Sequence, residues 1–199
     1  MMNKAAQAIT RAIHRERPNL TDLQIKTIQF GLECLMGEAI KLFIYFIIFY
    51  IFSAIPYFMI AMIFFSTIRV IAGGYHEETY WGCFFITLLL LSAIIIVGAK
   101  VPLNTYIRIA MLIVSIVLAW IYAPVDHPNK PIISSQRRKR FKHLSVLIIV
   151  LLGSISFLLP IQLGITAVTA ILMETATLPV GHLVNFRRKG VEADEDFKG

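Results

Sequence analysis

The sequence predicts an all-α, polytopic membrane protein with about six transmembrane helices preceded by amphipathic N-terminal helices. Hydrophobic residues make up 57% of the 199 residues, and the mean hydropathy is +0.73. Charged residues make up only 16% and are clustered between long apolar runs. This distribution is typical of membrane spans, because charges are costly in the bilayer and collect in the loops.

The first 37 residues are predicted to form cytoplasmic or interfacial helices. Small and apolar residues recur at helical spacing over residues 5–13, with basic residues on the other faces. Such a pattern is typical of a helix on an anionic lipid surface, and equally of a helix packed on the rest of the protein. Pro18 should end it. Thr21 and Gln24 have the spacing of a capping box, which predicts a second helix up to about Gly37.

The membrane spans are predicted to occupy residues 39–178 of a single membrane domain, residues 1–199. Six apolar stretches cover residues 39–55, 57–71, 84–99, 105–122, 144–159 and 161–178. Pro56 and Pro160 are interpreted as turns between paired spans, although each pair could form one long helix kinked at its proline. Two spans are favoured, since about 33 apolar residues exceed the membrane thickness.

The distribution of Lys and Arg predicts the orientation. These residues are concentrated in the N-terminal segment, the loop 123–143 and the tail 179–199. Six spans place all these regions and the loop 72–83 on one side, which the positive-inside rule assigns to the cytoplasm. Near the one long loop on the opposite side, only Lys100 and Arg108 are basic. The acidic stretch 192–196 is expected to be disordered.

The two cysteines, Cys34 and Cys83, both fall on the reducing side, so no disulfide is expected. Cys34 lies in an apolar helical stretch, which favours a packing role. Cys83 lies seven residues after His76. A thiol attacks as the thiolate, and an imidazole can take its proton and pass one to the leaving amine. Glu77 or Glu78 could orient that imidazole.

The spacing of His76 and Cys83 does not by itself establish a catalytic pair. The alternative is a loop that connects two helices and carries polar residues. On one straight helix, His76 and Cys83 would lie about 10.5 Å apart along the axis. Contact therefore needs a break between them, and Gly73 and Gly74 just upstream permit unusual backbone conformations. Arg69, at the end of an apolar span, could bind a substrate carboxylate or developing negative charge, or extend to the membrane interface.

The motifs that the sequence lacks argue against metal and nucleotide cofactors. The sequence contains no HExxH, Walker or dinucleotide-binding motif, so neither a metal nor a nucleotide cofactor is predicted. Zinc on Cys83, His76 and a distant histidine is the alternative. A basic run follows residue 136: Arg137, Arg138, Lys139 and Arg140. Such a run is typical of an anchor at anionic lipid, with an acidic peptide as the functional alternative. No nucleic acid partner is expected, because the membrane accounts for the net charge of +7.

Two motifs together resemble the accessory gene regulator B (AgrB) family. The first is Arg69 followed by Gly73-Gly74-Tyr75-His76 and Cys83, and the second is the stretch YAPVDHPNKPI at 122–132 before the basic run. The similarity covers nearly the whole chain, including the number of spans and the Leu-Pro-Val-Gly stretch at 178–181. Glu77 departs from the small residue expected at its position.

The resemblance implies a membrane cysteine endopeptidase of bacterial quorum sensing, with Cys83 as nucleophile and His76 as its base. Such a protein removes the acidic C-terminal tail of a small propeptide whose leader is amphipathic. The acyl-enzyme thioester is then displaced by a Cys or Ser of the propeptide, which gives a thiolactone or lactone autoinducing peptide without ATP. Lys130 and the basic run are expected to bind the acidic tail, and a homodimer is implied. The rival class is a non-enzymatic small membrane transporter or peptide exporter, but the spans lack the series of buried charges that marks a pathway.

Overall fold

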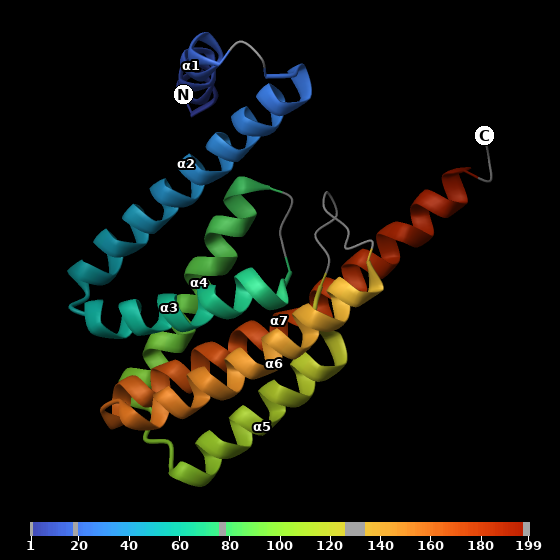
Figure 1. The fold of residues 1–199 in the computed structure, drawn as a ribbon. Helices are drawn as coiled ribbons and strands as arrows, with labels where there is room; N and C mark the ends of the chain where they lie inside the picture. The colour runs from blue at the N-terminus through green and yellow to red at the C-terminus, as the bar shows by residue number, and fades with distance from the viewer. Residues whose placement is uncertain (1, 18–19, 76–78, 126–133, 197–199) are drawn as a thin grey trace. The chain divides into compact units, whose positions relative to one another are not determined.

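The computed structural model describes residues 2–17, 20–75, 79–125 and 134–196. Within these ranges it has seven α-helices and no strand (Figure 1). Six of the helices are long and apolar enough to cross a membrane, which confirms the predicted fold class and identifies a multi-pass membrane protein. The chain divides into two compact units, residues 1–53 and 54–199, and each is described by itself. The single membrane domain stays a prediction.

The first unit consists of α1, Met2–Glu16, packed on α2, Asp22–Ile51. The predicted capping box begins α2: the Gln24 amide donates to Thr21 Oγ1 at 3.4 Å, and the Thr21 amide donates to Gln24 Oε1 at 3.0 Å. The predicted break near Gly37 is wrong, because α2 continues through that position as one helix. A single glycine costs a helix only about 1 kcal/mol and does not end it without a proline or a second cap.

Both proline-containing boundaries separate helices, as predicted. After α2, residues 52–54 are non-helical, and Pro56 lies in the first turn of α3, Ile55–Ala72. Likewise α6, Ser135–Leu158, ends just before Pro160, and α7, Ile161–Asp196, begins just after it. Proline is well suited to a first helical turn, where its missing N–H would have no partner.

In the second unit, α7 is the central helix. It packs against α3, α4 (Tyr80–Lys100), α5 (Thr105–Tyr122) and α6, and Figure 1 shows α5, α6 and α7 side by side. Of its membrane-spanning stretch 61% is buried, against 17% to 33% for the other four helices. Small residues such as Ala167 and Ala170 lie fully buried on it. Small side chains let membrane helices approach closely, which explains why α7 has neighbours on so many sides.

The C-terminal end differs from its predicted form. The sequence predicted a disordered acidic tail, whereas α7 continues through Pro179 to Asp196. Proline removes one backbone hydrogen bond, but membrane helices tolerate it when packing holds the helix on both sides. Here the flanking residues Leu178 and Gly181 are both buried, so the turn around Pro179 is held in place.

Arg108, which lies within the predicted span 105–122 near the loop, is only 6% exposed. Its guanidinium donates to the Ser156 carbonyl at 2.8 Å and lies 4.4 Å from the centre of the Phe157 ring. Ser156 belongs to the last turn of α6, where carbonyl groups lack helical partners and a cation is favourable. Arg108 therefore joins the start of α5 to the end of α6.

Candidate active site around Cys83

The loop that follows α3 has a backbone that only glycine readily adopts. Gly73 has a φ of +73°, and a methyl group on it would collide with the Val125 carbonyl oxygen. The Val125 amide in turn donates to the Ala72 carbonyl at 2.9 Å. The segment after α5 is therefore held directly against the end of α3, and the two loops lie at the same end of the unit, as six alternating spans require.

The other side of this loop packs on α7. A methyl group on Gly74 would lie 2.8 Å from Glu174 Oε1 and 2.9 Å from Thr177 Oγ1. A methyl group on Gly181 would lie 3.1 Å from the Tyr75 amide nitrogen. Residues 73–75 therefore run between the segment after α5 and α7, at distances that leave no room for a side chain at position 74.

An ion pair fixes the same loop from within. Arg69 Nη1 lies 3.1 Å from Glu174 Oε2 and 3.3 Å from Oε1, and Arg69 Nη2 donates to the Tyr75 carbonyl. The Glu174 side chain has no exposed surface, and that of Arg69 is 20% exposed. One guanidinium thus connects α3, α7 and the peptide unit that leads into position 76.

Cys83 lies in the first turns of α4, where Thr79 caps the helix. The Gly82 amide donates to Thr79 Oγ1 at 3.1 Å, and the Cys83 amide donates to the Thr79 carbonyl at 3.0 Å. Cys83 is half-buried and lines a cavity of about 20 Å³, enough for about one water molecule. The cavity is lined by Arg69, Tyr75, Cys83, Ile86, Thr87, Leu90 and Thr177.

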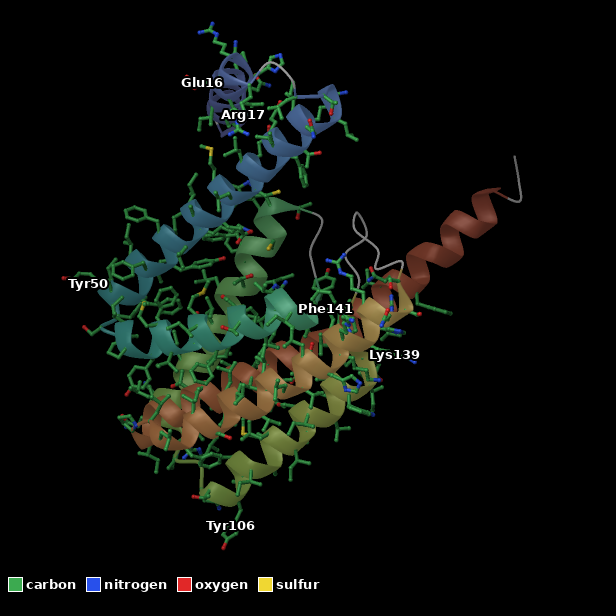
Figure 2. All side chains as sticks on the ribbon, in the orientation of Figure 1. Glu16, Arg17, Tyr50, Tyr106, Lys139 and Phe141 are labelled. Carbon is green, nitrogen blue, oxygen red and sulfur yellow. The ribbon has the colours of Figure 1, made fainter. Side chains whose placement is uncertain are left out.

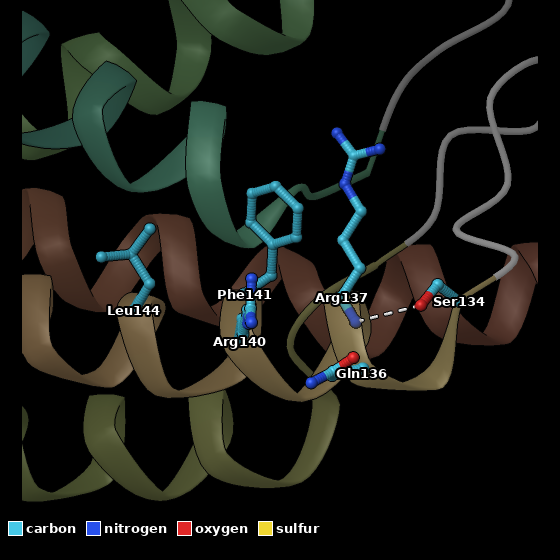
Figure 3. Close-up of a pocket in the computed structure, with 6 residues that line it drawn as sticks. All are labelled: Ser134, Gln136, Arg137, Arg140, Phe141 and Leu144. Atoms are coloured by element: carbon cyan, nitrogen blue, oxygen red, sulfur yellow. Dashed lines mark hydrogen bonds between the residues drawn. The ribbon is translucent and has the colours of Figure 1, made fainter.

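The basic run lies at the start of α6, also at this end of the unit. Ser134 caps the helix by accepting a hydrogen bond from the Arg137 amide at 3.4 Å. A surface hollow of about 380 Å³ is lined there by Arg137, Arg140 and Phe141 among others (Figure 3). The four basic side chains from Arg137 to Arg140 are exposed. Lys142 instead lies 5.0 Å from the Trp120 ring centre, which is typical of a lysine at a membrane interface.

The comparison with known proteins decides the family. The family model for accessory gene regulator B matches residues 5–178, which is most of the chain. The chain belongs to this family.

Similar AgrB proteins come from several bacteria. An AgrB-like protein of Clostridium beijerinckii is 28% identical over 72% of this chain and 71% of its own length. Accessory gene regulator protein B of Staphylococcus aureus strain Newman is 28% identical over 76% of this chain and 82% of its own length. No solved structure matches the chain. Membership of the AgrB family supports a role in quorum sensing of the accessory gene regulator type.

The AgrB motifs predicted from the sequence meet at one place. Arg69, Gly73, Gly74 and Cys83 gather at the cavity or the loop beside it. The second motif contributes Val125, and the C-terminal motif contributes Gly181. Four predicted site residues lie outside the described residues: His76, Glu77, Glu78 and Lys130. Their roles stay predictions.

Sequence reasoning missed Glu174 and Thr177. The signal for Glu174 was present: it is an ionisable residue within an apolar span, opposite in charge to Arg69 at the end of another. Ionisable residues inside membrane spans usually pair with one another, so these two were candidates for an ion pair. In the described part of the chain, no three His, Cys, Asp or Glu side chains lie close enough to hold a metal ion. The predicted independence from metal stays a prediction.

Proposed function

We propose that this AgrB-family protein is a membrane cysteine endopeptidase that removes the acidic tail of a small propeptide and closes the remaining peptide into a ring. The supporting observation is the position of Cys83. Cys83 lines a small cavity together with Arg69 and Tyr75, and Tyr75 directly precedes His76 in the chain. The described segment that leads to His76 therefore lies beside Cys83, which supports the proposal of a nucleophile and a general base on neighbouring segments.

The proposed chemistry proceeds in two acyl transfers. The Cys83 sulfur attacks the carbonyl carbon before the acidic tail, and His76 takes the thiol proton. The C–N bond breaks, the proton passes from His76 to the leaving amine, and a thioester links the peptide to Cys83. A thiol or hydroxyl within the propeptide then gives its proton to His76 and attacks the thioester carbonyl. The C–S bond to Cys83 breaks, the ring forms, and the proton returns to the Cys83 sulfur. A thioester retains an activated acyl group, so the sequence of steps needs no ATP.

Co-expression with the propeptide tests this function. Mass spectrometry should find a peptide without its tail and lighter by one water than the linear cleavage product, because ring closure replaces hydrolysis. Recovery of uncut propeptide alone would contradict the peptidase, and its recovery outside the cells would favour the exporter. The homodimer and the binding of anionic lipid belong to the same proposal.

The basic run is proposed to attract the acidic tail. Exposed charge pairs contribute about 0.2–1 kcal/mol each. Changing both Arg137→Glu and Arg140→Glu replaces attraction by repulsion, so we expect about tenfold weaker propeptide binding at low salt. Binding to purified protein should be measured at two salt concentrations. The control is Lys100→Glu, a charge reversal at the end of α4 that is far along this helix from Cys83. Equal affinity at low and high salt would contradict electrostatic recognition, since salt screens such pairs.

The site and both termini are proposed to face the cytoplasm. In a protein without Cys34 and Cys83, a single Val101→Cys should react with a membrane-impermeant maleimide in intact cells. A single Lys139→Cys should react only after lysis, because the basic run belongs on the cytoplasmic side. Both parent side chains are exposed, so burial does not complicate the comparison. The reverse labelling pattern would refute the orientation.

A further inference from the structure

Glu174 is a buried carboxylate, and a contribution to stability does not explain well why it is there. It lies on the most buried helix of the second unit with no exposed surface. Placing a charge inside a membrane bundle is costly, and replacing a buried ion pair by apolar residues is often neutral or even stabilising. The proposed chemistry does not use Glu174 as acid, base or nucleophile. We therefore infer the role of Glu174 from the other groups that its partner Arg69 contacts.

Arg69 uses different nitrogens for its two partners. Nη1 bonds the Glu174 carboxylate, and Nη2 bonds the Tyr75 carbonyl. The carboxylate fixes the direction of the planar guanidinium, because both carboxylate oxygens lie within 3.3 Å of Nη1. The Tyr75 carbonyl belongs to the peptide unit whose nitrogen is that of His76. The orientation of the guanidinium therefore constrains the backbone at the residue before the base.

The residues packed around Gly74 and Arg69 also restrict the position of this loop. Glu174 Oε1 fills the space that a side chain at Gly74 would occupy, and Thr177 fills the rest. Arg69 and Thr177 also line the cavity that Cys83 lines. Among the described residues, Arg69 is the charged group that contacts Glu174. A connected set of contacts thus runs from α7 through Arg69 to the Tyr75 carbonyl, and both Arg69 and Tyr75 line the cavity beside Cys83.

We propose that Glu174 is a positioning residue that acts through Arg69 to hold the Tyr75 carbonyl, directly before His76 in the chain, beside the cavity that Cys83 lines. The inference rests on the proposed function, in which His76 is the base for Cys83. Displacing a reacting group by about 1 Å can cost about 100-fold in rate, so a loss of this size is expected when the carboxylate is removed.

The test compares four proteins in a background where Cys34→Ala leaves Cys83 as the single thiol. They are the Cys34→Ala parent, His76→Ala, Glu174→Gln and the control Thr169→Val, whose buried hydroxyl bonds only its own helix. Alkylation of Cys83 by iodoacetamide is followed from about pH 5 to about pH 10, which brackets ordinary imidazole and thiol titration. Propeptide cleavage is measured on the same purified proteins.

Glu174→Gln is expected to follow the alkylation profile of His76→Ala and to lower kcat about 100-fold with KM little changed. Thr169→Val is expected to follow the parent. The inference alone is overturned if His76→Ala changes the profile while Glu174→Gln keeps that of the parent. If His76→Ala itself leaves the profile unchanged, the proposed base is wrong and the inference falls with it.

Two further variants separate positioning from folding. Arg69→Lys keeps the opposite charge beside Glu174, but its single nitrogen lacks the fork that reaches both partners, so it should behave as Glu174→Gln does. The double variant Arg69→Met with Glu174→Leu removes both charges and should insert and fold normally, yet lose the parent alkylation profile. A parent-like profile in either variant would show that the pair only neutralises charge, and would overturn the inference.

Discussion

Cys83→Ala is expected to abolish both cleavage and ring closure, with a fall in rate of at least about 10⁴-fold. Removing the nucleophile of a covalent mechanism leaves only binding and charge stabilisation, which account for a small part of the rate. Cys83 is half-buried and lines the cavity at the start of α4. Both activities should disappear together, because the same thioester precedes tail release and ring closure.

Cys34→Ala is the matched control for this change. Cys34 is exposed on α2 and has no assigned role in the chemistry, so the variant should retain cleavage and ring closure. Both variants should reach the membrane in equal amounts, as measured by immunoblot of the membrane fraction. Normal cleavage by Cys83→Ala protein would rule out the covalent scheme and favour a metal-activated water.

Gly73→Ala should have the second-largest effect, because two independent obstacles act on the added methyl group. With φ +73° and ψ −159°, Gly73 has a backbone conformation that essentially only glycine adopts, which costs an L-residue about 1–3 kcal/mol, and the methyl would collide with the Val125 carbonyl. The loop must move or the segment after α5 must separate from α3. Since that loop leads into His76, we expect at least about a 100-fold loss of cleavage.

Gly31→Ala is the control for a glycine-to-alanine change. Gly31 lies in α2 with nothing within 4 Å of an added methyl, so alanine there should leave activity intact and favour the helix by up to about 1 kcal/mol. Cleavage of the propeptide and thermal unfolding in detergent should be measured for both variants. If Gly73→Ala retains full activity, the loop geometry does not position the base.

The membrane fold was largely predictable because apolar runs and Lys or Arg clusters are local properties of the sequence. The turns at Pro56 and Pro160 followed from the length limit that a bilayer sets on a span. The continuity of α2 through Gly37 and of α7 through Pro179 was not predictable in the same way. A residue that weakens a helix locally breaks it only if packing does not compensate, and packing is a tertiary property.

Only some residues of the candidate site could be selected from the sequence, and the contacts between them could not. Cys83, Gly73 and Gly74 could be selected from the first motif, with their roles supplied by the family resemblance. Spacing predicted only that a break must separate His76 from Cys83, and α4 indeed begins at Tyr80. The pairing of Arg69 with Glu174 joins residues 105 positions apart, so no local pattern could establish it.

Formation of a covalent acyl-enzyme on Cys83 is the central claim, and trapping that species tests it most directly. A propeptide whose internal Cys or Ser is replaced by Ala can be cleaved but cannot close the ring. Incubated with purified protein, it should accumulate as an adduct whose mass is that of the protein plus the linear peptide without its tail, less one water. Peptide mapping should locate the adduct on Cys83, and hydroxylamine should release it, as expected of a thioester. Release of the tail at the normal rate with no adduct at Cys83 would contradict the account.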